Sequence, residues 1–148
     1  CGMKLGEFLE ERARLIKEIC SLEELRSMEF RELKDSPSEV RFKDITEQIN
    51  QKRKELRELK LRLMKLNLST KIPGHPEISS MMELNLKIAD IIEEIRCLRS
   101  LDPHCSYGSE IQPQLSPKEL RRILNDLVRE KVRLDVLRKM TNWSTEVE

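Results

Sequence analysis

Three side chains in the second half of the chain have metal-binding chemistry. Cys97, His104 and Cys105 are close in sequence, and thiolate and imidazole groups are the usual protein ligands of zinc. Their spacing, Cys-x6-His-Cys, matches no common zinc site, and a fourth ligand would still be needed. The pattern favours a Cys97 that packs at a helix end and two residues that line a loop, so no metal is predicted.

Groups for catalysis are equally sparse. The two histidines, His75 and His104, fall in predicted loops, and neither belongs to a recognisable nucleophile constellation. The four glycines are not spaced for a phosphate-binding loop. The sequence therefore predicts no catalytic residue, no cofactor and no enzymatic activity.

One basic run raises the question of nucleic-acid binding. Residues 51–65 contain seven basic side chains, but Glu55 and Glu58 interleave with them and an apolar seam runs through them. A phosphate-binding face needs basic side chains that cluster on one side of the helix and have few acidic neighbours. The formal charge of the whole chain is only +1. We expect a solvated helix face and no direct contact with nucleic acid.

Composition indicates which elements must carry whatever function the chain has. Charged residues make up 37% of the 148 residues and aromatic residues only 3%, which favours helices over strands. No run of eighteen apolar residues predicts a membrane span, and the first residues do not resemble a signal peptide. Four cysteines without a dense framework favour a reducing compartment, the nucleus or the cytoplasm.

Heptad spacing predicts an all-α fold. We expect an antiparallel helical bundle of about four long helices with coiled-coil-like packing, forming one domain over residues 1–148, with helices at 5–33, 37–67, 77–101 and 117–140. Lys52 is the only polar residue in the rows of the second helix, and snorkelling of its amine is favoured over a specific contact. The rows predict a core that includes Leu56, Leu59, Leu63 and Ile88.

Local signals mark the breaks between helices. Ser36-Pro37 followed by Glu39, and Ser116-Pro117 followed by Glu119, each have the pattern of a capping box with proline in the first turn. Residues 68–76 and 102–115 are predicted loops, and residues 141–148 are expected to fray. The four helices carry net charges of −3, +4, −2 and +4 in order, which favours antiparallel neighbours of opposite sign.

Residues 16–89 resemble the start of the histone-binding domain of the Daxx family of histone chaperones. The pieces IKEICSLEE, MEFRELKDSPSEV, INQKRKELRELKLRLMKL and KIPGHPEISSMMELNLKI follow in the family's order. The connection with Glu32-Leu33, Asp35 and Pro37, and the loop with Ile72-Pro73 and Pro76-Glu77, carry the resemblance beyond heptad spacing. It covers about half of the chain, and the region after Leu101 does not follow the family.

The resemblance implies a partner-binding region at the entrance to the second helix. There Glu29, Glu32 and Asp35 would face basic groups of an H3–H4 histone dimer. The family's tyrosine and glutamate that help to select an H3 variant correspond here to Val40 and Lys43. A slip of one residue would give Arg41 and Asp44 instead, and neither alignment reproduces the pair.

Two functions follow from these patterns. The first is a non-enzymatic helical protein-interaction module that binds H3–H4 in a Daxx-like, chaperone manner in the nucleus. The second is a structural scaffold or oligomerising coiled-coil bundle within a larger protein, which allows a homo-oligomer. A chaperone is expected to be partly loose alone and ordered by its partner, whereas a scaffold is expected to be rigid alone.

Overall fold

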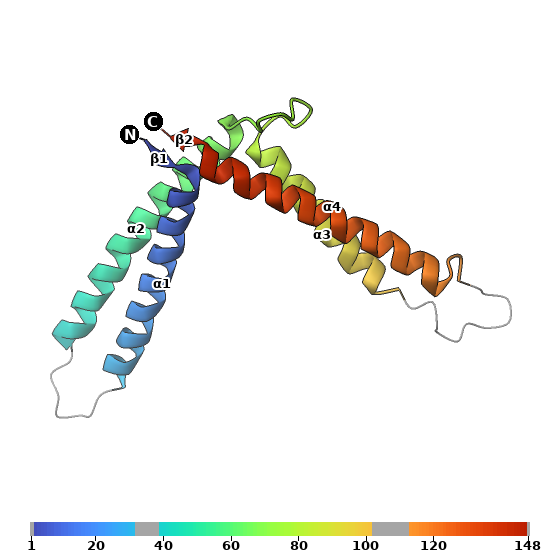
Figure 1. Cartoon of the computed structure of the whole chain (residues 1–148). Coiled ribbons are helices and arrows are strands. Elements are labelled where there is room, and N and C mark those ends of the chain that lie inside the picture. The colour runs from blue at the N-terminus through green and yellow to red at the C-terminus, as the bar shows by residue number, and fades with distance from the viewer. Residues whose placement is uncertain (1, 32–38, 102–112, 148) are drawn as a thin grey trace. The chain divides into compact units, whose positions relative to one another are not determined.

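The computed structural model describes residues 2–31, 39–101 and 113–147, and it confirms the all-α class with four long helices (Figure 1). The helices are α1 (Leu5–Phe30), α2 (Glu39–Ser69), α3 (Met81–Arg99) and α4 (Pro117–Ser144). Two short strands, β1 (Met3–Lys4) and β2 (Glu146–Val147), flank them. The chain divides into a first unit, Cys1–Asn67 with Asn142–Glu148, and a second unit, Leu68–Thr141. The expectation of one domain over 1–148 stays a prediction.

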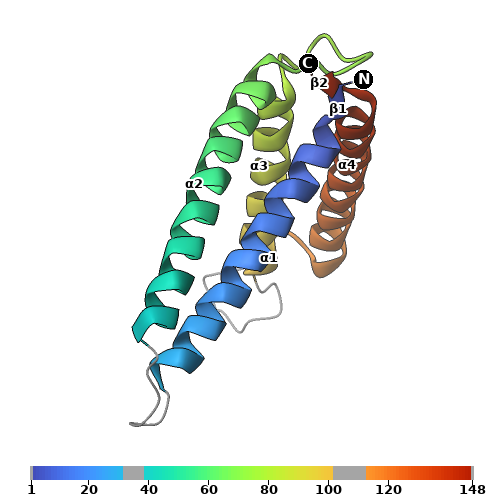
Figure 2. The same ribbon diagram turned by 90° about the vertical axis from the view of Figure 1, so that its left-hand side faces the viewer.

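The first unit is built on an antiparallel hairpin of α1 and α2, which lie side by side in both views (Figures 1 and 2). Ile19, Ile45 and Ile49 form a buried cluster, and Leu22 and Leu56 pack against it. Leu63 is buried as predicted, whereas Leu56 and Leu59 are only half-buried. The prediction was wrong for these two residues, because a hairpin covers each helix on one side only and both side chains keep part of their surface in contact with water.

Among the described residues, ion pairs join acids on α1 to bases on α2. They include Glu18–Lys52 at 2.7 Å, Glu23–Arg53 at 2.8 Å and Glu29–Arg41 at 3.3 Å. The two helices, which carry opposite net charges, are therefore neighbours joined by ion pairs, as predicted. Lys52 makes a specific contact with Glu18, which is the interpretation that the sequence favoured less.

The two ends of the described chain form a clasp in the first unit. Strands β1 and β2 pair antiparallel, with Met3 opposite Val147, and the amide of Leu5 donates to the carbonyl of Thr145 at 3.0 Å. Leu5 is fully buried. The expectation of fraying was wrong for residues 141–147. Helix α4 continues to Ser144, Thr145 accepts from Leu5, and Glu146 and Val147 pair with β1.

The second unit pairs α3 with α4, and buried apolar residues line both helices, including Met81, Leu84, Ile88, Ile95, Leu120 and Leu134. Helix α3 begins at Met81, later than predicted, because the Ser80 hydroxyl accepts from the Glu83 amide at 3.4 Å and caps it. The second capping box is confirmed: the Glu119 amide donates to the Ser116 hydroxyl and the Ser116 amide donates to the Glu119 carboxylate, both at 3.2 Å. The first predicted box, at Ser36, lies outside the described residues.

Candidate interaction surface at the end of the first hairpin

Apolar side chains are exposed where α1 ends and α2 begins. Met28 is 69% exposed and Phe30 is 78% exposed, and Leu25 is also exposed one turn earlier. Phe42, in the first turns of α2, lies with its ring centroid 6.1 Å from that of Phe30, at an interplanar angle of 50°. We call Leu25, Met28, Phe30 and Phe42 the hairpin end.

Polar contacts hold the two helices together beside these rings. The Arg26 guanidinium lies over the Phe42 ring, 5.8 Å from its centroid, and donates to the Thr46 hydroxyl at 3.4 Å. The Thr46 hydroxyl in turn donates to the Phe42 carbonyl at 2.9 Å. Phe42 is therefore positioned from both helices, and it supports the exposed ring of Phe30.

Glu29 lies between the helices and not on the open face of α1. Its side chain is only 12% exposed, and Oε1 accepts from Arg41 at 3.3 Å. Oε2 is buried and has no hydrogen-bond partner among the described residues. A buried carboxylate oxygen without a donor is costly, so this group is tied to the packing of the hairpin.

Of the other predicted partner-binding residues, two lie within the described residues and two do not. Lys43 is exposed on α2, and Val40 lies within the helix, although its side chain is not described. Glu32 and Asp35 lie outside the described residues. Of the predicted set and its one-residue alternative, the structure brings together Glu29 and Arg41, as an internal ion pair.

Sequence reasoning missed the aromatic part of this surface. Leu25 and Met28 lie alongside the row of Phe8, Leu15 and Leu22, whose spacing of seven predicts a buried stripe on the first helix, yet both are exposed. Phe30 and Phe42 are two of only three phenylalanines in the chain, and they flank the predicted break. Aromatic residues beside a helix connection, in a sequence so poor in them, were the available signal.

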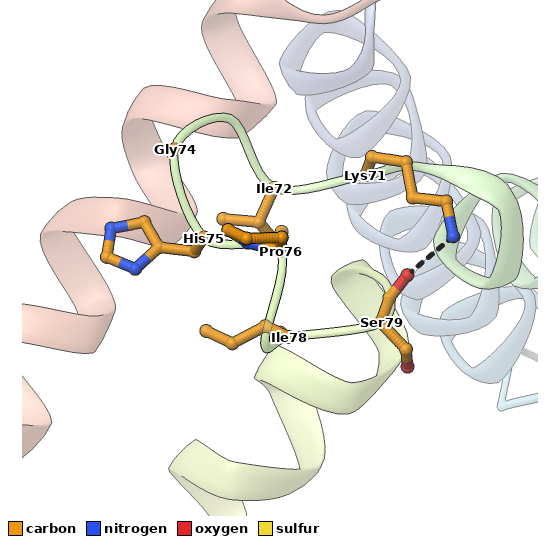
Figure 3. Close-up of a pocket in the computed structure, with 7 residues that line it drawn as sticks. All are labelled: Lys71, Ile72, Gly74, His75, Pro76, Ile78 and Ser79. Atoms are coloured by element: carbon orange, nitrogen blue, oxygen red, sulfur yellow. Dashed lines mark hydrogen bonds between the residues drawn. The ribbon is translucent and has the colours of Figure 1, made fainter.

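A second candidate lies in the loop between α2 and α3, where a pocket of about 380 Å³ is lined by residues that include Lys71, Ile72, His75 and Ile78 (Figure 3). The Lys71 amine donates to the Ser79 carbonyl at 3.0 Å. The His75 ring lies 2.9 Å from the Glu77 carboxylate, and this hydrogen bond lowers the pKa of Glu77. In Figure 3 the His75 and Lys71 side chains point away from each other, so they do not converge on one reacting atom.

Of the three side chains with metal-binding chemistry, only Cys97 lies in the described part of the chain. Cys97 is exposed, and its Sγ lies 3.6 Å from the Glu93 carboxylate, whereas His104 and Cys105 lie outside the described residues. Within residues 2–31, 39–101 and 113–147, no group of three or more His, Cys, Asp or Glu side chains could hold a metal ion. Across the same ranges, none of the helices has the length and apolar character required to cross a membrane.

Compared with protein families, curated proteins and solved structures, the chain gives no match. The resemblance to the Daxx family thus rests on the quoted sequence segments alone.

Proposed function

We propose that this chain is a non-enzymatic protein-interaction module that contacts its partner through the hairpin end. The observation that carries the proposal is the exposure of Phe30 and Met28, the two most exposed large apolar side chains in the described part of the chain. Exposed apolar side chains that gather at one end of a helix pair are typical of interaction surfaces. Aromatic residues are also enriched among those that dominate binding energy.

The proposed partner is an H3–H4 histone dimer. The resemblance to the Daxx family locates partner contacts at the entrance to the second helix, and Phe42 lies in the same turns as Val40 and Lys43. Three carboxylates of α1 are already paired with bases of α2. We therefore expect apolar contacts at the hairpin end, more than carboxylates, to supply the affinity for a helical partner.

The test replaces exposed apolar groups without touching the ion pairs. Met28→Gln with Phe30→Gln should weaken binding to purified H3–H4 dimers by at least about tenfold, which corresponds to about 1.4 kcal/mol. Met28→Gln should change the free energy of unfolding by less than about 0.5 kcal/mol, because the side chain is exposed. Phe30→Gln should lower it by no more than about 1.5 kcal/mol, because the ring contact with Phe42 is lost. Isothermal calorimetry measures the first quantity and urea unfolding the second.

Leu61→Gln with Met64→Gln is the matched control. Both residues are exposed on α2, and Leu61 lies about 28 Å along the helix from Phe42, at 1.5 Å per residue. The control should bind H3–H4 as the wild type does. Absence of H3–H4 binding by the wild type, or equal binding by the wild type and the Met28/Phe30 variant, would refute the proposal.

The scaffold function remains the second candidate, because Leu61 and Met64, the residues of the control variant, form an exposed apolar pair on α2. Leu61 and Met64 are one helical turn apart, and both are more than half exposed, so two copies of α2 could pair along this face. Light scattering would then give the mass of a dimer for the wild type. The Leu61/Met64 variant would give the mass of a monomer.

A further inference from the structure

A second apolar surface lies in the second unit, in a groove between α3 and α4. The groove has a volume of about 500 Å³ and is lined by three apolar and three basic side chains: Ile92, Ile95, Val128, Arg96, Arg99 and Lys131. No acidic residue lines it. Of the three basic side chains, Arg96 is paired with Glu93 and Lys131 with Asp135, whereas Arg99 forms no ion pair with a described residue. An apolar floor beside these basic groups is suited to an apolar side chain carried on an acidic segment.

The apolar surface continues from the groove along α4. Val128, Val132, Val136 and Met140 follow at intervals of four residues, and all four are exposed. Residues four apart form a ridge inclined by about 26° to the helix axis, against which another helix packs. The outward face of a surface helix is normally polar, so this ridge needs an explanation other than the packing of α4 on α3.

Basic side chains dominate both sides of the ridge. Lys139 and Arg129 are exposed beside it; Lys139 interacts with the Asp135 carboxylate at longer range, and Arg129 forms no ion pair with a described residue. Asp135, the acid nearest the ridge, is already paired with Lys131 at 2.8 Å and with Arg138 at 2.9 Å. The basic side chains outnumber the acids beside them, because Asp135 is shared by Lys131, Arg138 and Lys139, so the carboxylates of a partner can still pair with them.

We infer that the groove and the ridge together bind an amphipathic helix whose apolar stripe is flanked by Asp or Glu residues. Such a helix would place an apolar side chain against Val128 in the groove and follow the ridge toward Met140. Its carboxylates would reach Arg99, Arg129 and Lys139. This partner site is distinct from the hairpin end and does not rest on the proposed binding of H3–H4.

The charges favour this occupant over other ones. A second copy of the chain would bring the same basic flanks together, and like charges in an interface are repulsive. The phosphates of a nucleic acid would pair with the basic side chains, but a nucleic acid would leave the valines without apolar contacts. An anionic membrane surface shares the basic and apolar requirements, so vesicles are included in the test.

The probes are two synthetic peptides with the same leucine stripe, one flanked by Glu and the other by Lys, each labelled with a fluorophore. Fluorescence anisotropy should show that the whole chain binds the Glu-flanked peptide at least tenfold more tightly than the Lys-flanked one. Val132→Gln with Val136→Gln should weaken binding of the Glu-flanked peptide by about tenfold or more. Arg129→Glu with Lys139→Glu should reverse the preference between the peptides.

The matched control is Leu61→Gln with Met64→Gln, which removes equally exposed apolar groups from a basic stretch of α2 and should leave peptide binding unchanged. Equal binding of the two peptides, or no binding, would overturn the inference. Binding to vesicles of phosphatidylcholine and phosphatidylserine in place of the peptide would assign the surface to membranes instead. A dimer of the wild type that the Val132/Val136 variant abolishes would assign it to self-association.

The two proposals can fail separately. The Val132/Val136 variant should keep full affinity for H3–H4, and the Met28/Phe30 variant should keep full affinity for the Glu-flanked peptide. Loss of only one activity in each variant identifies two independent surfaces.

Discussion

Substituting Gly6 by alanine tests the clasp in the first unit, because two opposing effects meet at this residue. Gly6 is buried in the first turn of α1, and alanine in place of glycine stabilises a helix by up to about 1 kcal/mol. However, a Cβ at this position would lie 2.6, 2.7 and 2.8 Å from three ring carbons of Trp143. Those distances are too short for carbon atoms, so the indole or the helix must shift.

The magnitude follows from the balance of the two effects. Overpacking a core site costs about 1–3 kcal/mol. The Trp143 indole is 47% exposed and can shift, so the cost lies toward the lower end and offsets the gain in helix propensity. We expect Gly6→Ala to lower the free energy of unfolding by about 0–2 kcal/mol. In a Trp143→Ala background the clash is removed, and the same substitution should stabilise the chain by up to about 1 kcal/mol.

A double-mutant cycle provides the measurement. Urea unfolding of the wild type, both single variants and the double variant, followed by circular dichroism, yields a coupling energy that we expect to be about 1–3 kcal/mol. The change of sign between the two backgrounds is the decisive result. If Gly6→Ala stabilises the wild type as much as the Trp143→Ala variant, the indole does not pack on α1 and the clasp is refuted.

Three further predictions concern the two helix pairs. Ile49→Ala, at a fully buried position in the cluster of the first unit, should lower the free energy of unfolding by about 2–5 kcal/mol, measured by urea unfolding. Ser116→Ala should cost about 1 kcal/mol in the same assay, because the Glu119 amide loses its acceptor. The hydrogen bond from Lys52 lowers the pKa of Glu18, so its stabilisation is present at neutral pH and is lost as the pH falls through that lowered pKa. The difference in urea midpoint between the wild type and Glu18→Gln should therefore be largest near neutrality and vanish in acid.

The class of fold and the capping of α4 could be predicted because both depend on residues close in sequence. The rows of apolar residues need only the helical period, and the box at Ser116 and Glu119 needs only a spacing of three. The net charges of the helices likewise predicted the pairing of α1 with α2. Which atoms pair could not be predicted, and for Lys52 the favoured interpretation was wrong, because a heptad row does not show whether an acid on the facing helix is within reach.

The clasp could not be predicted, because it depends on residues far apart in sequence. Met3 pairs with Val147, and Gly6 packs on Trp143, and no local pattern connects them. Short strands of two residues also carry no alternation that could be recognised in a sequence. Residues 141–148 were expected to fray because polar terminal segments usually do.

The position of Glu29 changes which part of the first helix can serve a partner. The sequence offered an acid-rich helix, and an acid-rich helix suggests a basic partner held by ion pairs. The hairpin uses that charge itself: Glu18, Glu23 and Glu29 each meet a base on α2, so separating them would cost the hairpin its own contacts. Reversal of Glu29 to lysine would place two cations side by side in a mostly buried position, and any loss of binding would then reflect a damaged hairpin. Met28 and Phe30 at this end of the hairpin are exposed and apolar. They can therefore contact a partner without breaking an ion pair between the two helices. Binding that depends on them should weaken little as salt is raised, since screening acts on charges and not on apolar burial.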